Sequence, residues 1–498
     1  TQLIARRIRE LGVFSEILPW DAPETEIRSE NPKGIVISGG PGTVLASDAP
    51  TVPVTLLDGS VPVLGICYGM QLVGHLLGGT VKKGDFAEYG KASVTLDEVA
   101  SPLFAGVPRD LTVWMSHWDY VESPPPGFDV TAKSESGMIA GFSGAGGSIQ
   151  AIQFHPEVSH TAEGSRILEN FLFRLCECSG TWSLSDWAEA AVRQIREKVG
   201  ADRVVCGLSG GVDSTVSAVL THQALGDRLE CIFVDTGLLR ANEAEEVLET
   251  YRNHLDLKVH FVDAADIFLD ALSGVGDPEK KRKIIGETFI RVFEKKAEKI
   301  GGAKWLLQGT VYPDVIESGK RGKDAAVIKS HHNVGGLPEE MDLDVLEPVR
   351  DLFKDEVRKI GKMLGVPESI LKRHPFPGPG LAVRCLGEVT RERLGTLRKA
   401  DAVFIEEIIR AGLYDSLWQA FCVLLPVRTV GVMGDIRTYA EVVGLRAVES
   451  IDAMTADWAK LPPDLLDRTA RRICNEVAGA NRVVYDVTAK PPSTIEWE

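Results

Sequence analysis

The sequence predicts an α/β protein built from several domains. Its 498 residues exceed what one hydrophobic core usually holds, because single cores rarely grow beyond about 250–300 residues. Short apolar runs alternate with amphipathic stretches, which is typical of parallel sheets covered by helices. The clearest runs are Gly34-Ile-Val-Ile-Ser38, Val61-Pro-Val-Leu-Gly-Ile66, Arg203-Val-Val-Cys-Gly-Leu208 and Glu230-Cys-Ile-Phe-Val-Asp235.

Composition and charge narrow the class of protein. Hydrophobic residues at 44% and charged residues at 25% are ordinary for a globular chain, and no apolar run reaches the length of about 18 residues that spans a bilayer. The net charge of −16 disfavours broad binding to nucleic acid or anionic membranes, so any bound phosphate must be held locally. The eight cysteines are scattered, and no export signal is visible, so a cytoplasmic protein is expected.

Two breaks divide the chain into three predicted domains, 1–178, 179–374 and 375–498. The first lies near Cys176-Glu-Cys-Ser-Gly-Thr181, where a helical run ends and a new amphipathic segment begins with a cap at Ser183 or Ser185. The second lies at His374-Pro-Phe-Pro-Gly-Pro-Gly380, because three prolines and two glycines cannot continue a helix or a central strand.

The first chemical motif is Gly65-Ile-Cys-Tyr-Gly69, which follows an apolar strand and precedes a helix-like run over 70–77. Small residues two before and two after Cys67 permit the tight turn of a nucleophile elbow. A helix N-terminus also favours a thiolate and helps to hold an oxyanion. The alternative is a buried structural cysteine in a glycine-rich turn.

The second motif is Gln153-Phe-His-Pro-Glu157, which continues a strand-like segment. Side chains two apart on an extended chain face the same way, so Glu157 can orient the imidazole of His155 while His155 takes a thiol proton. Such a pair taken alone is more often a surface hydrogen bond. Its combination with Cys67 favours a Cys-His-acid triad.

Together with Ser38-Gly-Gly-Pro-Gly42, these motifs resemble the class I (triad) glutamine amidotransferase domain. The resemblance implies a glutaminase in residues 1–178, with Cys67 as nucleophile, His155 as general base and Glu157 as orienting acid. It also implies that the oxyanion hole and the glutamine pocket are formed by Gly39, Gly40, Tyr68, Gln71, Ser116 and His117.

The third motif is Ser209-Gly-Gly-Val-Asp-Ser-Thr215, which lies between a strand and a helix-like run. It lacks the Gly-Lys-Ser/Thr ending of a Walker A loop, so a kinase or an ordinary P-loop ATPase is disfavoured. The glycine pair lets backbone N–H groups approach a ligand closely, and hydroxyls at a helix N-terminus suit a pyrophosphate. A structural turn with polar caps is the alternative.

This motif resembles the signature of the N-type ATP pyrophosphatases, which implies a parallel-sheet domain of adenine-nucleotide α-hydrolase type over residues 179–374. ATP would be cut between its α- and β-phosphates, with Mg²⁺ held by Asp213 and no prosthetic group. The implied nucleotide contacts are Ser209, Gly210, Gly211, Val212, Asp213, Ser214, Thr215, Val234 and Lys329. Asp314 and Glu317 would belong to a lid, whereas His331 and His332 lack neighbours at ligand spacing and are expected to be structural.

The third segment resembles the α+β dimerisation domain of the GMP synthetase family. The resemblance rests on His374-Pro-Phe-Pro-Gly-Pro-Gly-Leu-Ala-Val-Arg384, Gly431-Val-Met-Gly-Asp435 and the end Lys490-Pro-Pro-Ser-Thr-Ile-Glu-Trp-Glu498. It implies that a homodimer converts xanthosine monophosphate (XMP), glutamine and ATP to GMP, AMP, diphosphate and glutamate, without a nucleic-acid or membrane partner. XMP would be bound by Gln419, Arg482, Lys490, Ile495 and Glu496.

The sequence departs from this family at two places. The apolar strand that precedes the stretch matching Thr1–Glu10 is absent, so the first sheet is expected to lack one strand. Trp118 stands where the family has glycine, and its bulk beside the glutamine pocket could narrow that pocket. Other readings are a different ATP-pyrophosphatase amidotransferase, which would lack the C-terminal motifs, and a ligand sensor, which would have lost Cys67, His155 or the Ser209 loop. A nucleic-acid-binding module is disfavoured by the net charge and by the lack of a reader motif.

Overall fold

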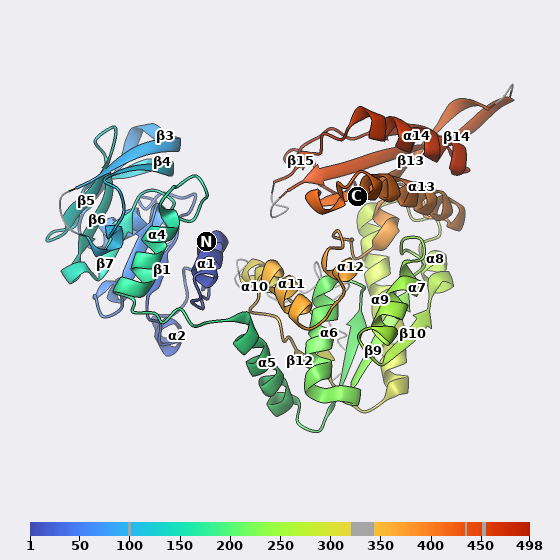
Figure 1. Ribbon diagram of the computed structural model, residues 1–498, viewed down its shortest axis with the longest axis horizontal. Helices are drawn as coiled ribbons and strands as arrows, with labels where there is room; N and C mark the ends of the chain where they lie inside the picture. Colours follow the sequence, from blue (N-terminus) through green and yellow to red (C-terminus); the bar gives the residue numbers. More distant parts are fainter. Residues whose placement is uncertain (98–100, 320–342, 434–435, 451–454) are drawn as a thin grey trace. The chain divides into compact units, whose positions relative to one another are not determined.

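The computed structural model describes residues 1–97, 101–319, 343–433, 436–450 and 455–498 (Figure 1). The chain forms two compact units, Thr1–Asp186 and Trp187–Glu498. The division lies near the predicted boundary at residue 178, whereas the boundary predicted at residue 374 falls inside the second unit; the domain bounds stay predictions. In the described ranges, no helix combines the length and the apolar character needed to cross a membrane.

The first unit is built on a seven-stranded sheet in the order β1-β2-β7-β6-β5-β3-β4. β1, β2 and β7 are parallel, and the other pairings are antiparallel. The alternating burial of β4 shows one face on the core and the other toward solvent. The strands are β1 Ile35–Ile37, β2 Val63–Ile66, β3 Thr80–Leu96, β4 Asp110–Ser123, β5 Asp129–Ser134, β6 Ile139–Gly144 and β7 Ile149–Ile152.

Helices cover this sheet and close the unit. The predicted helical run at its end is present as α4, which continues into the π-helical stretch η4. Ser183 then caps α5, because its hydroxyl accepts a hydrogen bond from the backbone N–H of Asp186 at 3.2 Å. The helices are α1 Gln2–Glu10, α2 Glu24–Ser29, α3 Tyr68–Leu76, α4 Gly164–Glu169 and η4 Asn170–Leu175, with α5 at Leu184–Val199.

The second unit contains a five-stranded parallel sheet in the order β10-β9-β8-β11-β12. The chain starts at β8 in the centre, builds outward through β9 and β10, and returns to the other side of β8 with β11. Ligands in such sheets bind at the carboxyl ends of the strands where the order reverses, here between β8 and β11. The strands are β8 Arg203–Leu208, β9 Leu229–Asp235, β10 Val259–Asp263, β11 Ala303–Leu307 and β12 Asp344–Leu346.

The two faces of this sheet are covered by different helices. Val205 and Ile232 pack in one core with Phe293 of α9. Their neighbours Cys206 and Cys231 point to the opposite face, because side chains alternate along a strand. The helices are α6 Val212–Leu225, α7 Glu243–Asn253, α8 Ala265–Ala271, α9 Pro278–Ile300, α10 Tyr312–Gly319, α11 Lys354–Met363 and α12 Glu368–Leu371.

The last part of the chain forms an antiparallel hairpin, β13 Gln419–Met433 and β14 Ile436–Glu449, which packs on helix α13, while helix α14 packs on α13 and on the last strand, β16 (Figure 1). β15 Asp457–Trp458 and β16 Ala480–Tyr485 pair with β14. Phe404 of α13 and Cys422 of β13 share one hydrophobic core with Ile232 of the parallel sheet. The C-terminal hairpin and its helices are therefore continuous with the parallel-sheet part of the unit.

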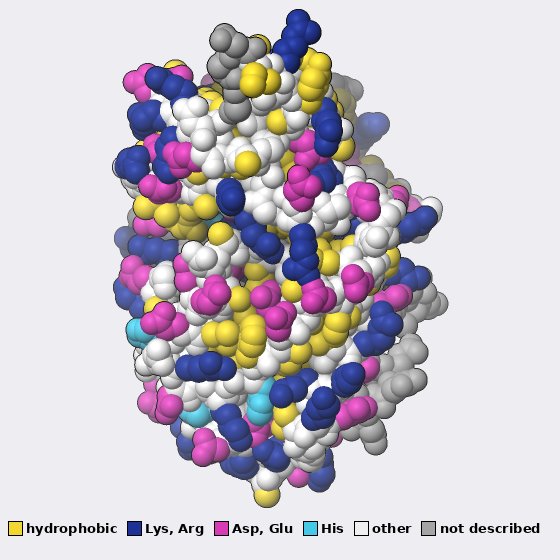
Figure 2. Space-filling model, turned by 90° about the vertical axis from the view of Figure 1, so that its right-hand side faces the viewer, with side chains coloured by type: hydrophobic (Ala, Val, Ile, Leu, Met, Phe, Trp, Pro, Cys, Tyr) yellow, Lys and Arg dark blue, Asp and Glu magenta, His cyan; other side chains and the backbone are white. Residues whose placement is uncertain are grey.

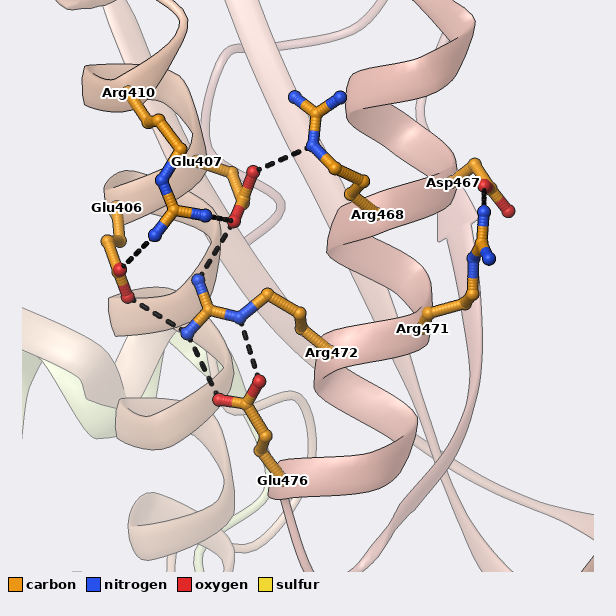
Figure 3. A network of polar contacts seen from close by, with 8 residues as sticks. All are labelled: Glu406, Glu407, Arg410, Asp467, Arg468, Arg471, Arg472 and Glu476. Carbon is orange, nitrogen blue, oxygen red and sulfur yellow. Dashed lines mark hydrogen bonds and ion pairs between the residues drawn. The ribbon is translucent and has the colours of Figure 1, made fainter.

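An ion-pair network joins α13 Arg391–Arg410 to α14 Pro463–Glu476 (Figure 3). Glu407 has a fully buried side chain, and its carboxylate accepts hydrogen bonds from Arg410 at 2.7 Å, Arg472 at 2.9 Å and Arg468 at 3.2 Å. Burial raises the pKa of Glu407, but these guanidinium groups outweigh burial and lower it. The network fixes the two helices against each other.

Candidate functional site

Cys67 lies in the sharp turn between β2 and α3. Its backbone has φ 57° and ψ −108°, a conformation that a residue with a Cβ rarely adopts. A Cβ on Gly69 would lie 2.0 Å from the carbonyl oxygen of Ile37, and one on Gly65 would lie 2.7 Å from the carbonyl oxygen of Gly69. Both positions therefore require glycine, as the elbow motif predicts.

His155 and Glu157 follow β7 and face this turn. His155 Nδ1 lies 2.9 Å from Glu157 Oε1, and the two side chains are 18% and 8% exposed. Burial lowers the pKa of His155, but hydrogen bonds with Cys67 and Glu157 outweigh burial and raise it to about 10. The imidazole is thus held as a cation beside the Cys67 thiol.

The loop after β1 completes the surroundings of the thiol. A Cβ on Gly39 would lie 3.1 Å from the His155 ring and 3.4 Å from Cys67 Cβ, and one on Gly40 would lie 3.8 Å from the ring of Tyr68. Tyr68 is the first residue of α3, where backbone N–H groups lack partners within the helix. The structure therefore brings Gly39, Gly40 and Tyr68 beside Cys67.

The residues predicted to bind glutamine fall into two groups. Ser116 contributes its backbone, since Cys67 Sγ lies 3.5 Å from its carbonyl oxygen. Gln71 and His117 are buried, and both hydrogen-bond to the carbonyl oxygen of Asp119, at 2.7 and 3.0 Å. His117 Nε2 lies 3.1 Å from Glu88 Oε2, so the ring links β4 to β3.

Asp119 was not singled out by the sequence motifs. Its Oδ2 is buried and has no hydrogen-bond partner among the described residues. An unpaired buried carboxylate oxygen is costly, so a ligand that supplies an N–H group would stabilise it. Trp118, next to it, is 46% exposed.

The Ser209 loop lies at the carboxyl end of β8, at the point where the strand order reverses. Gly210 has φ 77°, and Gly211 is the N-cap of α6. The Ser209 and Ser214 hydroxyls lie 3.0 Å apart, and Thr215 donates to the carbonyl oxygen of Gly211 at 2.7 Å. Val212 is the first residue of α6, so the loop presents hydroxyls and N–H groups at a helix N-terminus.

Two cations approach this loop from distant parts of the chain. Lys354, the first residue of α11, lies 3.2 Å from Asp213 Oδ2. Arg373 donates to the carbonyl oxygen of Gly210 at 3.3 Å and pairs with Glu243 at 3.0 Å. They supply positive charge at a loop that lacks the Walker lysine.

The structure describes only some of the other residues that were predicted to bind the nucleotide. Val234 is buried in β9. Asp314 accepts a hydrogen bond from the backbone N–H of Val311 at 3.1 Å at the start of α10. Lys329, the two histidines and the side chain of Glu317 lie outside the described residues.

Several predicted acceptor residues meet at the start of β13. Glu496 Oε1 accepts from Gln419 Nε2 and from Arg384 Nη2, both at 2.8 Å. Ile495 is buried in a small cluster with Phe421. Gln419 also donates to the carbonyl oxygen of Pro375 at 2.9 Å.

The segment 373–376 therefore links the two parts of the site. Arg373 touches the Ser209 loop, and Pro375 touches Gln419 two residues later. The guanidinium carbon of Arg240, which follows β9, lies 4.9 Å from the centroid of the Phe376 ring, and that of Arg384 lies 5.1 Å from the same centroid. The proline-rich stretch ends regular structure as predicted, and in space it connects the nucleotide loop to the acceptor cluster.

Lys490 and Arg482 lie at different distances from this cluster. The backbone of Lys490 forms an isolated antiparallel β-bridge with Ala456, and Ala456 shares a hydrophobic cluster with Ile495. Arg482 is exposed and stands opposite Val442, which pairs with Leu425 of β13. Since Leu425 is six strand positions from Gln419, Arg482 lies about 20 Å along the sheet from the cluster within one chain.

Three family models match successive parts of the chain: glutamine amidotransferase class-I over residues 1–175, NAD synthase over 185–283 and GMP synthase C terminal domain over 406–497. The glutamine-hydrolysing GMP synthase of Aquifex aeolicus is 57% identical over 497 residues, which is 100% of this chain and 97% of that protein. Proteins of the same description from Nitratidesulfovibrio vulgaris and Caldicellulosiruptor saccharolyticus are both 55% identical with the same coverage. The chain belongs to the glutamine-hydrolysing GMP synthase family.

As a GMP synthase, the chain catalyses the ATP-dependent and glutamine-dependent amination of XMP to GMP. The predicted fold class is confirmed, with a class I glutaminase domain, a parallel-sheet pyrophosphatase domain and a C-terminal domain of the GMP synthase type. The reading as a different amidotransferase is thereby excluded.

Proposed function

We propose that Cys67, His155 and Glu157 perform the glutaminase half of the reaction. The Cys67 thiolate attacks the amide carbon of glutamine, and the C–N bond breaks as His155 gives its proton to the departing ammonia. Water then hydrolyses the thioester to glutamate and restores the thiol, with His155 as general base. One observation carries this assignment: the thiol stands on a strained elbow beside an imidazole that Glu157 orients.

The Ser209 loop is proposed to hold the β- and γ-phosphates of ATP, with Lys354 and Arg373 as further cations. The C2 oxygen of XMP attacks the α-phosphorus, the α–β bond breaks, and diphosphate leaves. Ammonia then displaces AMP from C2 to give GMP. Adenylation is needed because the C2 oxygen is otherwise a poor leaving group. The position of the loop at the reversal of strand order supports this assignment.

Asp213 is proposed to hold Mg²⁺ together with ATP. Its Oδ1 is buried without a hydrogen-bond partner in the described part of the chain, so it is available as a ligand. No cluster of three or more His, Cys, Asp or Glu side chains in the described ranges could hold a metal ion by itself. Mg²⁺ typically takes one or two carboxylates plus substrate phosphates, which this site would provide. When bound, the ion would offset negative charge on the phosphates.

XMP is proposed to bind where Gln419, Ile495 and Glu496 meet, with Lys490 near them. The polar pair of Gln419 and Glu496 supports this assignment, because it offers directed hydrogen bonds at a position where Gln419 is buried. Arg482 lies about 20 Å along the sheet from this cluster within one chain, so it is proposed as a phosphate contact supplied by the second copy of a homodimer. Lys329, Asp314 and Glu317 are proposed as parts of the pyrophosphate site and its lid.

We also propose a homodimer formed through the β13–β14 hairpin. β16 pairs with β14 over Glu441–Leu445, and the hairpin strands extend past this pairing, since Arg428–Met433 of β13 pairs with Ile436–Glu441 of β14. This part carries exposed apolar side chains, and hydrophobic side chains stand near the top of Figure 2 around it. A large exposed apolar patch is typical of a protein interface. Its members are Val427, Val430, Val432, Ile436 and Tyr439, each between 51% and 72% exposed.

A cytoplasmic location is proposed as well. All eight cysteines are free thiols, including the adjacent strand neighbours Cys206 and Cys231. Free thiols in this number suit a reducing compartment.

The deciding experiment is the Cys67→Ala variant, assayed for AMP and GMP with glutamine and, separately, with ammonium. Glutamine-driven synthesis should vanish while ammonium-driven synthesis remains. An Asp213→Ala variant should lose both. Loss of both routes at Cys67, or of neither, would contradict the two-site scheme.

A further inference from the structure

Arg384 is a buried cation directly after the short 3₁₀ turn Gly380–Val383. Its side chain is completely buried, and its guanidinium carbon lies 4.0 Å from the ring centroid of Phe421 and 5.1 Å from that of Phe376. Two aromatic rings therefore restrict the plane of the guanidinium.

This guanidinium holds one carboxylate with two parallel hydrogen bonds. Arg384 Nε donates to Glu496 Oε2 at 3.1 Å, and Nη2 donates to Oε1 at 2.8 Å. A bidentate pair fixes the carboxylate in position and in rotation, which a lysine ammonium cannot do. Gln419 Nε2 donates to the same Oε1, so its amide is oriented by the same carboxylate.

We propose that Arg384 is a positioning residue for XMP: it fixes the Glu496 carboxylate, and through Glu496 it orients Gln419 for the acceptor base. The inference rests on the proposed acceptor site. The Gln419 amide nitrogen donates to Glu496 Oε1 and to the carbonyl oxygen of Pro375, so this contact holds the amide in one orientation. The pair then forms before XMP arrives, so binding does not have to order it.

The C-terminal tail has other anchors, which separates this role from folding of the tail. Lys281 contacts Glu498 at 2.5 Å and the carbonyl oxygens of Ala382 and Cys385 at 3.1 and 2.9 Å. Arg446 donates to the carbonyl oxygens of Thr488 and Thr494. Loss of the Arg384 guanidinium should therefore release Glu496 while the rest of the tail stays bound.

The test uses Arg384→Met and Arg384→Lys in the full chain, assayed by the ammonium-driven route. The expected result is a rise of at least 30-fold in KM for XMP in the methionine variant, with KM for ATP changed less than twofold. The lysine variant should lie between, because one ammonium can make only part of the bidentate contact. Arg471→Met is the matched control, since Arg471 is 71% exposed and pairs only with Asp467 among the described residues.

The outcomes distinguish this inference from the acceptor site itself. If Gln419→Ala and Glu496→Gln leave KM for XMP unchanged, the proposed acceptor site is wrong. If they raise it but Arg384→Met lowers kcat alone, as a loss of folded protein would, the positioning role is wrong. Should the methionine variant not fold, the lysine variant decides, and a KM for XMP equal to that of the unaltered chain would overturn the inference.

Discussion

Replacing Glu157 with glutamine tests how the glutaminase is activated. The change keeps the shape of the side chain and removes its charge, so the 2.9 Å contact with His155 loses its charged acceptor. Hydrogen bonds to charged groups contribute about 1.5–3 kcal/mol and neutral ones about 0.5–1.5 kcal/mol. The difference of about 1–2 kcal/mol corresponds to a loss of about 5- to 30-fold in glutamine hydrolysis, as a lower bound if the amide also favours the wrong tautomer.

The pH dependence gives a second measure of the same change. The raised pKa of His155 means that its cationic form persists above the ordinary value of 6.5 and is lost as the pH rises through about 10. In the Glu157→Gln variant this loss should begin at a lower pH.

The assay measures glutamate release from pH 6 to pH 10, with ammonium-driven GMP formation as the internal control. The control should not change, because ammonia bypasses the thiol. An equal fall in both routes, or an alkaline limb that stays near pH 10, would refute the reasoning.

Three other changes probe separate parts of the chain. Gly69→Ala should prevent folding of the elbow or cost several kcal/mol, because its Cβ would lie 2.0 Å from the Ile37 carbonyl oxygen; thermal unfolding and glutamate release measure it, and a wild-type melting temperature would exclude the described turn. Lys354→Met should raise KM for ATP about tenfold in both routes, since a charge-assisted contact contributes about 1.5–3 kcal/mol. The surface control Lys359→Met should leave this KM unchanged. If the two variants have the same KM for ATP, Lys354 is not part of the site. Glu407→Gln should lower the free energy of unfolding by about 2 kcal/mol and leave the KM values unchanged. Because the pKa of Glu407 is lowered in the folded chain, the difference in stability between the two proteins should shrink as the pH falls and the carboxylate is protonated. Urea unfolding at pH 7 and pH 4 tests this.

The parts of the site that lie in short sequence stretches could be predicted. The elbow at Cys67 and the loop at Ser209 follow from glycine positions and from the strand and helix on either side, all within about ten residues. The strand–turn–helix order at both places is present in the structure. His155 and Glu157 needed only their spacing of two on an extended segment.

The contacts between distant segments could not be predicted in this way. Lys354 meets Asp213 across 141 residues, and Arg384 meets Glu496 across 112. Lys354 belongs to no motif. Arg384 ends the motif that begins at His374, but nothing in that motif indicates a buried cation, and a basic residue on a helix or turn is most often at the surface. The full burial of Arg384 was the property that distinguished it, and burial emerges only when the segments are packed.

The backbone of Cys67 carries a consequence for how this protein can change. A non-glycine residue at φ 57° costs of order 1–3 kcal/mol, and glycine at the same place would avoid that cost. Selection for stability alone would therefore remove the thiol. At this position a reactive group lowers the stability of the folded chain. Random mutation of this turn is therefore expected to yield variants that are more stable but no longer use glutamine.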